Sequence, residues 1–452
     1  MQYFSCKVLH MLSRLTTLCL SALFVLGAQA QANIDGHPAW INNGNIYEVN
    51  LRQYTPEGTF NAFAAHLPRL KRMGVQTLWF MPIHPISKKD RKGVLGSYYA
   101  IANFRTVNPE YGTLADWKRL VQKAHSLGMK VIIDWVPNHS GGDHYWLTSH
   151  PDFYVRDKNG QPLSPFDWTD VRKLDYSNPR LADSMTATLK YWIKETGIDG
   201  YRCDVAAEVP QAYWKTCIAE LKKVKNVFML AEADEPWLHD AGFDATYGWN
   251  DFANWKAIAR GEKNAAYVDT SLNRVATGFK KGARRLMFTS NHDENSWNKA
   301  DYGTMPGAVH GPFAVLTATV PRGIPLIYSG QEEPFLDSLS FFYKDTINFR
   351  KYARAPLYQR LLELRRTVPA LGSDASFVKL RTNNDGALYA FERRNGNSKV
   401  LVILNLSDKQ QQLSWQTKPS QKTWYNVFGY QSEPVDQGFG IEPWGYAVYT
   451  EK

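Results

Sequence analysis

The chain has 452 residues, of which 44% are hydrophobic and 21% are charged, and its formal net charge is +10. This length accommodates one large α/β domain and a smaller module. The positive charge is spread along the chain, and its sharpest cluster, residues 88–92, is typical of a solvated loop. The charge pattern therefore argues against a nucleic-acid-binding or membrane-surface protein.

The first 30 residues have the pattern of a secretory signal peptide. Lys7 and Arg14 form a basic start and precede an apolar stretch of 13 residues, Leu15–Gly27. Ala28-Gln-Ala30 resembles a cleavage site. A helix that spans a bilayer needs about 20 apolar residues. We expect a secreted or periplasmic protein that begins near Gln31, with a net charge of about +8 and no integral membrane span.

Alternating strand-like and helix-like patterns occupy the chain from Ile46 to about Leu371. Short apolar runs alternate with amphipathic stretches, which is typical of a parallel βα barrel. Two of the helical stretches, residues 63–73 and 117–127, are followed by glycines that favour helix C-caps, Gly74 and Gly128. We therefore predict a (β/α)8 TIM barrel.

Four of the predicted strands lead directly into charged and polar residues. The strands are Lys130–Ile133, Ile198–Tyr201, Val227–Leu230 and Arg285–Phe288. The side chains at or just beyond their ends are Asp134, Asn138, His139, Arg202, Asp204, Glu232, His292 and Asp293. Because the carboxyl ends of parallel barrel strands share one rim, these side chains are expected to gather there. One such carboxylate is usually a cap, but four strands with this feature indicate an active site.

Two segments depart from the barrel pattern. Residues 139–174 are long and irregular and contain Trp146 and Trp168. Long ordered loops on a compact barrel are usually functional. After Gly372 the pattern changes to short alternating strands separated by turns such as residues 384–386. This spacing predicts a C-terminal antiparallel β-sandwich domain.

The two cysteines beyond the predicted signal peptide are Cys203 and Cys217. Such sparse usage makes a disulfide framework unnecessary for folding. Cys203 lies between Arg202 and Asp204, so on a strand its side chain points away from theirs. A buried free thiol is expected at Cys203, and a bridge to Cys217 is the alternative.

Together these segments resemble the α-amylase family, glycoside hydrolase family 13. Its four conserved regions are matched in order by residues 134–139, 201–204, 230–232 and 289–293. Residues 74–82 and 323–331 resemble the second and eighth barrel strands, and residues 99–113 resemble the loop that carries a tyrosine under the reacting sugar. After the predicted signal peptide (1–30), the resemblance implies a catalytic barrel (31–138 and 175–371), a short domain B after strand 3 (139–174) and the C-terminal domain (372–452).

The resemblance also implies roles for three carboxyl groups. Cleavage of a glycosidic bond needs two carboxyls with opposite protonation tasks. Asp204 matches the nucleophile, Glu232 the general acid/base, and Asp293 the carboxylate that binds sugar hydroxyls. Arg202 lies two residues before Asp204 and projects to the same side of the strand. We expect its guanidinium to orient Asp204 and to lower the pKa of that carboxyl.

Further residues match the family's substrate-binding positions. Tyr99 is the expected platform beneath the reacting sugar, since a sugar's C–H face suits an aromatic ring. His139 and His292 are expected to hydrogen-bond the same sugar, and Arg202 is grouped with them. Asp134 is expected to be architectural and to orient Arg202. Trp146 and Trp168, in the irregular segment 139–174, are further candidates for sugar contacts.

The family's structural calcium is an open alternative here. Asn138 matches a calcium ligand of the family. Many α-amylases have Lys-His three and four residues after the nucleophile, where this chain has Ala207 and Glu208. Calcium takes 6–8 oxygen ligands, and the sequence does not supply a convincing set. No cofactor is required for the expected chemistry.

The resulting expectation is a retaining hydrolase that cleaves α-1,4-glucosidic bonds of starch or maltooligosaccharides. The altered Ala207 and Glu208 leave open a transglycosylase, or an enzyme that cleaves maltodextrins or cyclodextrins. A remote alternative is a non-catalytic, family-like binding domain. The expected partner is an α-glucan, with no nucleic acid, and the oligomeric state has no signature in the sequence.

Overall fold

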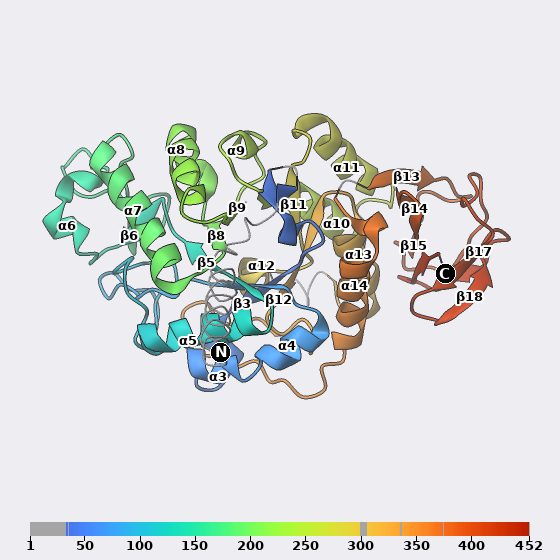
Figure 1. Ribbon diagram of the computed structural model, residues 1–452, viewed down its shortest axis with the longest axis horizontal. Helices are drawn as coiled ribbons and strands as arrows, with labels where there is room; N and C mark the ends of the chain where they lie inside the picture. The colour runs from blue at the N-terminus through green and yellow to red at the C-terminus, as the bar shows by residue number, and fades with distance from the viewer. Residues whose placement is uncertain (1–32, 35, 299–304, 335–336, 374, 452) are drawn as a thin grey trace, which may run out of the picture.

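The computed structural model describes residues 33–34, 36–298, 305–334, 337–373 and 375–451 (Figure 1). The predicted signal peptide lies outside these residues. Eight described strands pair in parallel and in chain order to form a closed barrel. They are β3 (Ile46–Val49), β4 (Thr77–Phe80), β5 (Lys130–Trp135), β8 (Gly200–Cys203), β9 (Phe228–Ala231), β10 (Ala245–Tyr247), β11 (Arg284–Met287) and β12 (Gly323–Tyr328). The prediction of a TIM barrel is confirmed.

The strand boundaries decide which polar residues lie within the barrel strands and which follow them. Asp134 and Arg202 were expected beyond their strands, but β5 and β8 continue through them. The two residues are register partners on adjacent strands, so their side chains lie side by side. Asp204 and Glu232 follow directly after β8 and β9. The sheet thus delivers one arginine and several carboxyls to a single rim.

Helices surround the barrel and pack their apolar faces against its strands. They are α2 (Leu51–Tyr54), α3 (Phe60–Ala64), α4 (Leu67–Met73), α5 (Leu114–Ser126), α7 (Pro179–Thr196), α8 (Gln211–Lys222), α9 (Trp237–Asp240), α10 (Trp249–Ala259), α11 (Tyr267–Gly278), α12 (His292–Asn298), α13 (His310–Thr319) and α14 (Ala355–Thr367). The predicted helical stretch at residues 63–73 is divided, because a new helix starts at Leu67 with Pro68 in its first turn. Gly74 ends α4 in the left-handed conformation, as predicted.

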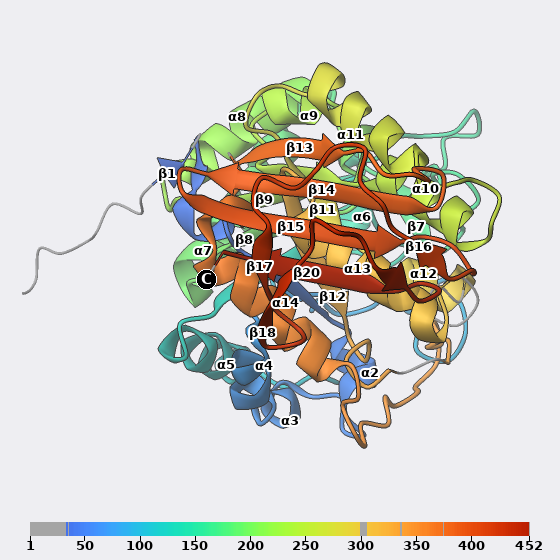
Figure 2. The ribbon, with the colours of Figure 1, turned by 90° about the vertical axis from the view of Figure 1, so that its right-hand side faces the viewer.

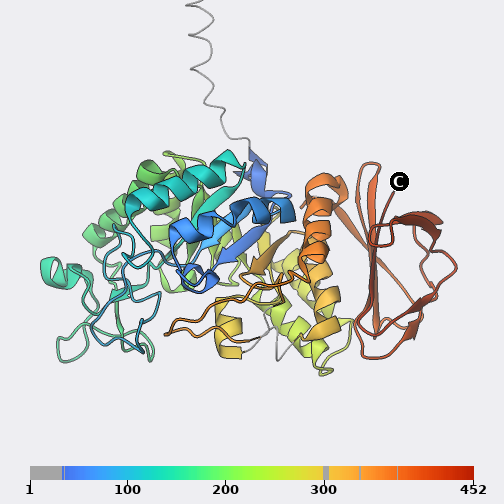
Figure 3. The same cartoon turned by 90° about the horizontal axis from the view of Figure 1, so that it is seen from below.

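The segment between β5 and α7 forms the insertion after the third barrel strand. It contains β6 (His139–Gly141), α6 (Trp146–Ser149), a 3-10 turn (Pro151–Phe153) and β7 (Val171–Lys173), and β6 pairs antiparallel with β7. Figures 1 and 3 place this insertion and the C-terminal domain at opposite ends of the barrel. Trp146 is buried within the insertion against Phe153, with ring centroids 5.4 Å apart. It is therefore a core residue, and its predicted sugar contact is wrong.

The C-terminal domain is antiparallel, as predicted (Figure 2). Its main sheet has the order β13-β14-β15-β20-β17-β18, and β16 pairs with β19 in a separate two-stranded sheet. The bounds are β13 (Ser376–Leu380), β14 (Leu388–Asn395), β15 (Ser398–Asn405), β16 (Gln411–Gln412), β17 (Thr423–Asn426), β18 (Gln431–Pro434), β19 (Gly440–Ile441) and β20 (Tyr446–Thr450). One face of the main sheet joins the core of the barrel domain, and its other face has a separate apolar core.

Both described cysteines, Cys203 and Cys217, are free and buried. The free thiol expected at Cys203 is therefore observed, and the alternative of a bridge to Cys217 is not. The domain boundaries proposed from the sequence stay predictions.

A close approach between β8 and β9 makes Gly200 a sensitive position. A Cβ atom at Gly200 would lie 2.0 Å from the backbone oxygen of Phe228. Gly200→Ala should therefore destabilise the protein by about 1–3 kcal/mol or more, as overpacked sites do. Thermal unfolding measures this loss. Gly278→Ala is the control, because a Cβ there meets no atom within 4 Å; equal midpoints for the two variants would contradict the packing argument.

Candidate active site

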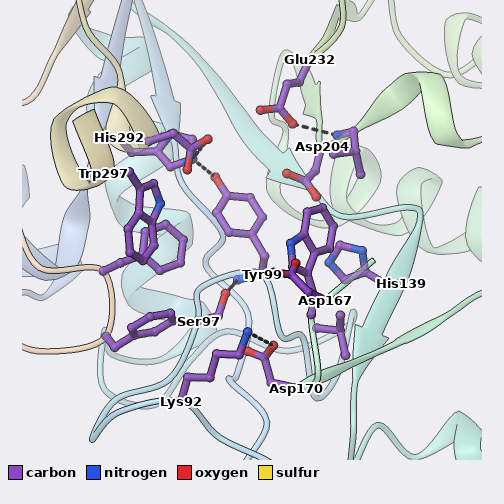
Figure 4. A pocket seen from close by; sticks show the side chains of 16 residues that line it. Lys92, Ser97, Tyr99, His139, Asp167, Asp170, Asp204, Glu232, His292 and Trp297 are labelled. Carbon is purple, nitrogen blue, oxygen red and sulfur yellow. Dashed lines mark hydrogen bonds and ion pairs between the residues drawn. The ribbon is translucent and has the colours of Figure 1, made fainter. Parts of the chain in front are cut away.

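A cavity of about 450 Å³ opens at the carboxyl-terminal rim of the barrel (Figure 4). Six of the eight predicted site residues line it: Tyr99, His139, Asp204, Glu232, His292 and Asp293. They come from four barrel strands or their following loops and from the β4–α5 connection. Arg202 lies beneath them, fully buried. The structure therefore brings together the residues that the sequence singled out, apart from Asn138.

Arg202 connects three carboxyl groups below the cavity. Its Nη1 donates to Asp134 Oδ1 at 2.8 Å and to Asp204 Oδ1 at 2.9 Å. Its Nη2 lies 2.7 Å from Glu232 Oε1 as an ion pair. Glu232 also accepts a hydrogen bond from the Val205 backbone N–H at 2.8 Å. The carboxyls of Asp204 and Glu232 are thus held at fixed positions by one shared cation.

The pKa of Asp204 is raised, although Arg202 was expected to lower it. Burial raises the pKa of Asp204 well above its usual range, the charge of Glu232 raises it further, and Arg202 only partly opposes them. Burial also raises the pKa of Asp134 to about 6, again against Arg202. Three carboxyls share one guanidinium, so the group retains a proton at a pH where exposed carboxyls are ionised. A retaining glycosidase needs both a proton donor and a carboxylate at this place.

Tyr99 and His292 form a hydrogen-bonded chain along the cavity floor. The Tyr99 hydroxyl donates to Asp134 Oδ2 at 3.1 Å and lies 2.7 Å from His292 Nε2. Their rings are stacked at 5.4 Å. Asp134 therefore orients both Arg202 and Tyr99, which agrees with the architectural role expected for it.

Glu48 is a site residue that the sequence reasoning missed. It is fully buried on β3, and its Oε1 lies 2.5 Å from His292 Nδ1. Burial opposes protonation of His292, yet the charges of Asp293 and Glu48 raise the pKa of His292 to about 9. His292 is therefore an imidazolium at neutral pH. The available signal was a single acidic residue within the apolar strand Ile46–Val49.

His139 and Trp168 form the opposite wall of the cavity, with ring centroids 5.4 Å apart. Burial and the nearby charge of Lys173 lower the pKa of His139 to about 3, so its imidazole is neutral. A neutral imidazole can donate one hydrogen bond and accept another, which suits sugar hydroxyls. Trp168 lines the cavity, where it could contact a sugar as predicted, whereas Trp146 is buried inside the insertion.

The contacts of Asn138 and the acidic groups near it bear on the calcium alternative. Its side-chain Nδ2 pairs with His139 Nδ1 at 3.3 Å, and its backbone carbonyl accepts from the Leu174 N–H. At the nearby position of Glu208, the carboxylate pairs with the Lys173 ammonium at 3.4 Å. Within the described ranges, no group of three or more His, Cys, Asp or Glu residues could hold a metal. Calcium also takes amide and backbone carbonyl oxygens as ligands, so the calcium alternative at Asn138 stays a prediction.

Several residues at the mouth of the cavity were also missed. They are Lys92, Asp170, Trp297, Phe341 and Phe342. Trp297 lies four residues after Asp293 on α12, which places both on one helix face. The others come from loops whose proximity depends on the whole fold. A closed parallel barrel with paired carboxyls and stacked aromatic rings at its rim defines the class, an enzyme that acts on glycosidic bonds.

Comparison with known proteins identifies the family. The model of the alpha amylase catalytic domain matches residues 30–172 and 163–355, and that of the alpha amylase C-terminal all-beta domain matches residues 380–447. The chain belongs to the α-amylase family, glycoside hydrolase family 13. Within the described residues, no helix is both long and apolar enough to cross a membrane.

Individual relatives agree with this assignment. Alpha-amylase MalA of Haloarcula japonica is 26% identical over 82% of this chain, which spans 56% of MalA. The noncanonic maltogenic alpha-amylase AmyB from Thermotoga neapolitana is 27% identical, with a TM-score of 0.83 over 91% of this chain and 99% of that one. An alpha-amylase from Lactobacillus plantarum is 31% identical, with a TM-score of 0.81 and the same coverage.

Replacing Glu48 tests the electrostatic support of His292. Because the pKa of folded His292 is raised, its protonation stabilises the fold fully below pH about 6.5 and this contribution is lost as the pH rises through about 9. Glu48→Gln should lower the pKa of His292 and weaken this pH dependence. The measurement is the thermal unfolding midpoint between pH 6 and 10, with an NMR titration of His292.

Glu235→Gln is the control for this experiment, since Glu235 is exposed and lies outside the cavity lining among the described residues. It should leave the wild-type pH dependence unchanged. An unaltered titration of His292 in Glu48→Gln would contradict the assigned role of Glu48.

Proposed function

We propose that the protein is a retaining α-glucan hydrolase that cleaves α-1,4-glucosidic bonds of maltooligosaccharides or starch. The observation that carries this proposal is the shared contact of Asp204 and Glu232 with Arg202, at 2.9 and 2.7 Å, on the floor of the cavity. Family membership supports a glycosidase-type activity. The maltogenic alpha-amylase similar in structure supports an α-glucan substrate.

In the first step, Asp204 forms a bond to the anomeric carbon of the sugar above Tyr99. In the reactive form the shared proton lies on Glu232, and Asp204 is ionised beside Arg202. The bond from that carbon to the glycosidic oxygen breaks, and Glu232 delivers its proton to the departing oxygen. Asp204 is nine-tenths buried and held by Arg202, so its attacking oxygen is oriented before substrate arrives. The product of this step is a covalent glycosyl-enzyme.

In the second step, water replaces the departed sugar. Glu232 removes a proton from the water, whose oxygen bonds to the anomeric carbon as the ester bond to Asp204 breaks. Two displacements restore the original configuration, and Glu232 regains its proton. His292 and Asp293 hydrogen-bond the sugar in both steps, and no cofactor takes part in the proposed reaction.

A sugar acceptor in place of water would make the enzyme a transglycosylase. The short side chain of Ala207 and the Lys173-paired Glu208 leave the region beyond Glu232 unlike that of many α-amylases. Relatives named as a cyclomaltodextrinase and as a maltosyltransferase also match most of this chain. This second candidate uses the same Asp204 and Glu232 and differs only in the acceptor.

The N-terminal 30 residues support a further part of the proposal, export from the cytoplasm. Their basic start, apolar stretch and small-residue cleavage site are those of a secretory signal. The proposed location is therefore extracellular or periplasmic, where an α-glucan would be met as a nutrient.

Substitution of the two paired carboxyls tests the proposed activity. Asp204→Ala and Glu232→Gln should each lower kcat on maltoheptaose by several orders of magnitude, because one removes the nucleophile and the other the proton donor. Product chromatography over time measures this loss. Glu235→Gln, three residues beyond the acid, should retain wild-type turnover because its side chain is exposed.

The products also separate the two candidate functions. Only shorter maltooligosaccharides indicate a hydrolase, whereas early products longer than the substrate indicate a transglycosylase. A loss of less than tenfold in either carboxyl variant would contradict the assigned roles. Unchanged folding of both variants, measured by circular dichroism, excludes a merely structural cause.

A further inference from the structure

An ion pair borders the cavity at the end that lies away from Glu232. Figure 4 shows Glu232 at one end, Tyr99 in the middle, and Lys92 with Asp170 at the opposite end. The Lys92 ammonium lies 3.5 Å from Asp170 Oδ1. Asp170 is 4% exposed, whereas Lys92 is partly exposed to the cavity and to solvent. This ion pair joins the β4–α5 connection to the insertion across the cavity's end.

The loop that carries Lys92 is fastened to the insertion by further contacts. Asp143 accepts hydrogen bonds from the backbone N–H groups of Lys88 and Lys89, at 2.7 and 3.2 Å. Asp90 pairs with Arg172 at 2.5 Å. These contacts hold the loop against the insertion independently of Lys92. Removal of the Lys92 side chain should therefore open the end of the cavity without releasing the loop.

The same loop is also held from the other side. The Leu95 N–H donates to the Phe342 carbonyl at 3.0 Å, and Phe342 belongs to the segment after β12. Phe341 in that segment packs against Trp297, with ring centroids 5.3 Å apart. An aromatic wall of Trp297, Phe341 and Phe342 thus leads from the floor of the cavity to the Lys92–Asp170 pair. Aromatic rings are suitable surfaces for the apolar faces of sugars.

The position of Glu232 determines which way a bound glucan chain runs through the cavity. A general acid protonates the oxygen of the departing sugar, so that sugar lies on the Glu232 side. The sugars that stay attached to Asp204 must then extend the other way, toward Lys92 and Asp170. In an α-1,4-glucan these are the units toward the non-reducing end. The end bordered by Lys92 and Asp170 therefore receives the non-reducing end of the substrate.

We propose that Lys92 and Asp170 form a specificity-determining barrier that binds the non-reducing terminal glucosyl unit and limits how many units fit before the cut. The ammonium donates to, and the carboxylate accepts from, sugar hydroxyls that include the 4-hydroxyl, which only the non-reducing end presents. The enzyme thus cuts at a fixed number of units from the non-reducing end and releases short fragments of one main length. This inference rests on the proposed α-glucan activity.

The test uses maltopentaose, maltohexaose and maltoheptaose labelled at the reducing end. The purified mature enzyme should cut each at the same distance from the non-reducing end, so the labelled fragment lengthens by one unit as the substrate does. Lys92→Ala should spread the cuts to longer non-reducing fragments and raise their ratio to the main fragment at least about tenfold, the effect of losing a charge-assisted contact. Asp170→Asn should shift the cuts in the same direction.

Lys88→Ala is the matched control, since Lys88 is exposed on the same loop and outside the cavity lining among the described residues. It should cut as the wild type does. Wild-type cuts scattered along the chain, or an unchanged pattern in both Lys92→Ala and Asp170→Asn, would overturn the barrier while leaving the hydrolase proposal standing. Absence of cutting by the wild type on every α-glucan would overturn the hydrolase proposal and the barrier with it.

Discussion

The buried guanidinium of Arg202 is the interaction on which the site depends. Its burial would be strongly unfavourable without compensating charge. Asp134, Asp204 and Glu232 supply that charge from the ends of three adjacent barrel strands, β5, β8 and β9. Removal of one partner from such a buried pair typically costs about 3–5 kcal/mol. The same contacts therefore hold the strand ends together and set the positions of the two carboxyls that the proposed chemistry requires.

The balance of positive and negative groups around the cavity also decides which side chains keep a proton. Three carboxyls beside one arginine favour retention of a proton, and burial strengthens this tendency at Asp204 and Asp134. On the other side, Glu48 and Asp293 keep His292 protonated. The barrel thus places carboxyls that share a proton and a cationic hydrogen-bond donor within one cavity. The loops around it, rather than the barrel, shape the space that the substrate can enter.

Much of this arrangement could be predicted from local sequence, for a physical reason. Asp204, Glu232 and Asp293 each lie within a few residues of a strand end, and parallel strands place those ends on one rim. Glu48 was missed because its role depends on a histidine 244 residues away. The pKa of Asp204 was predicted to be lowered, whereas burial raises it. The sequence shows the adjacent arginine but does not show the burial.

Residues at the mouth were harder to predict than those on the floor. Lys92 and Asp170 meet only because two loops from different parts of the chain are folded against each other. Trp146 and Trp168 have equivalent sequence contexts, yet one is buried in the insertion and the other lines the cavity. Side chains on long loops therefore need the structure before a role can be assigned.

The most direct test of the account is to trap the glycosyl-enzyme with a fluorinated α-glucosyl or α-maltosyl substrate that reacts slowly in the second step. Peptide mass spectrometry then locates the attached sugar. The account predicts the added mass on the Asp204 carboxyl, and its loss on incubation with water or an acceptor sugar. Attachment to Glu232 or Asp293, or turnover with inverted configuration and no covalent species, would contradict it.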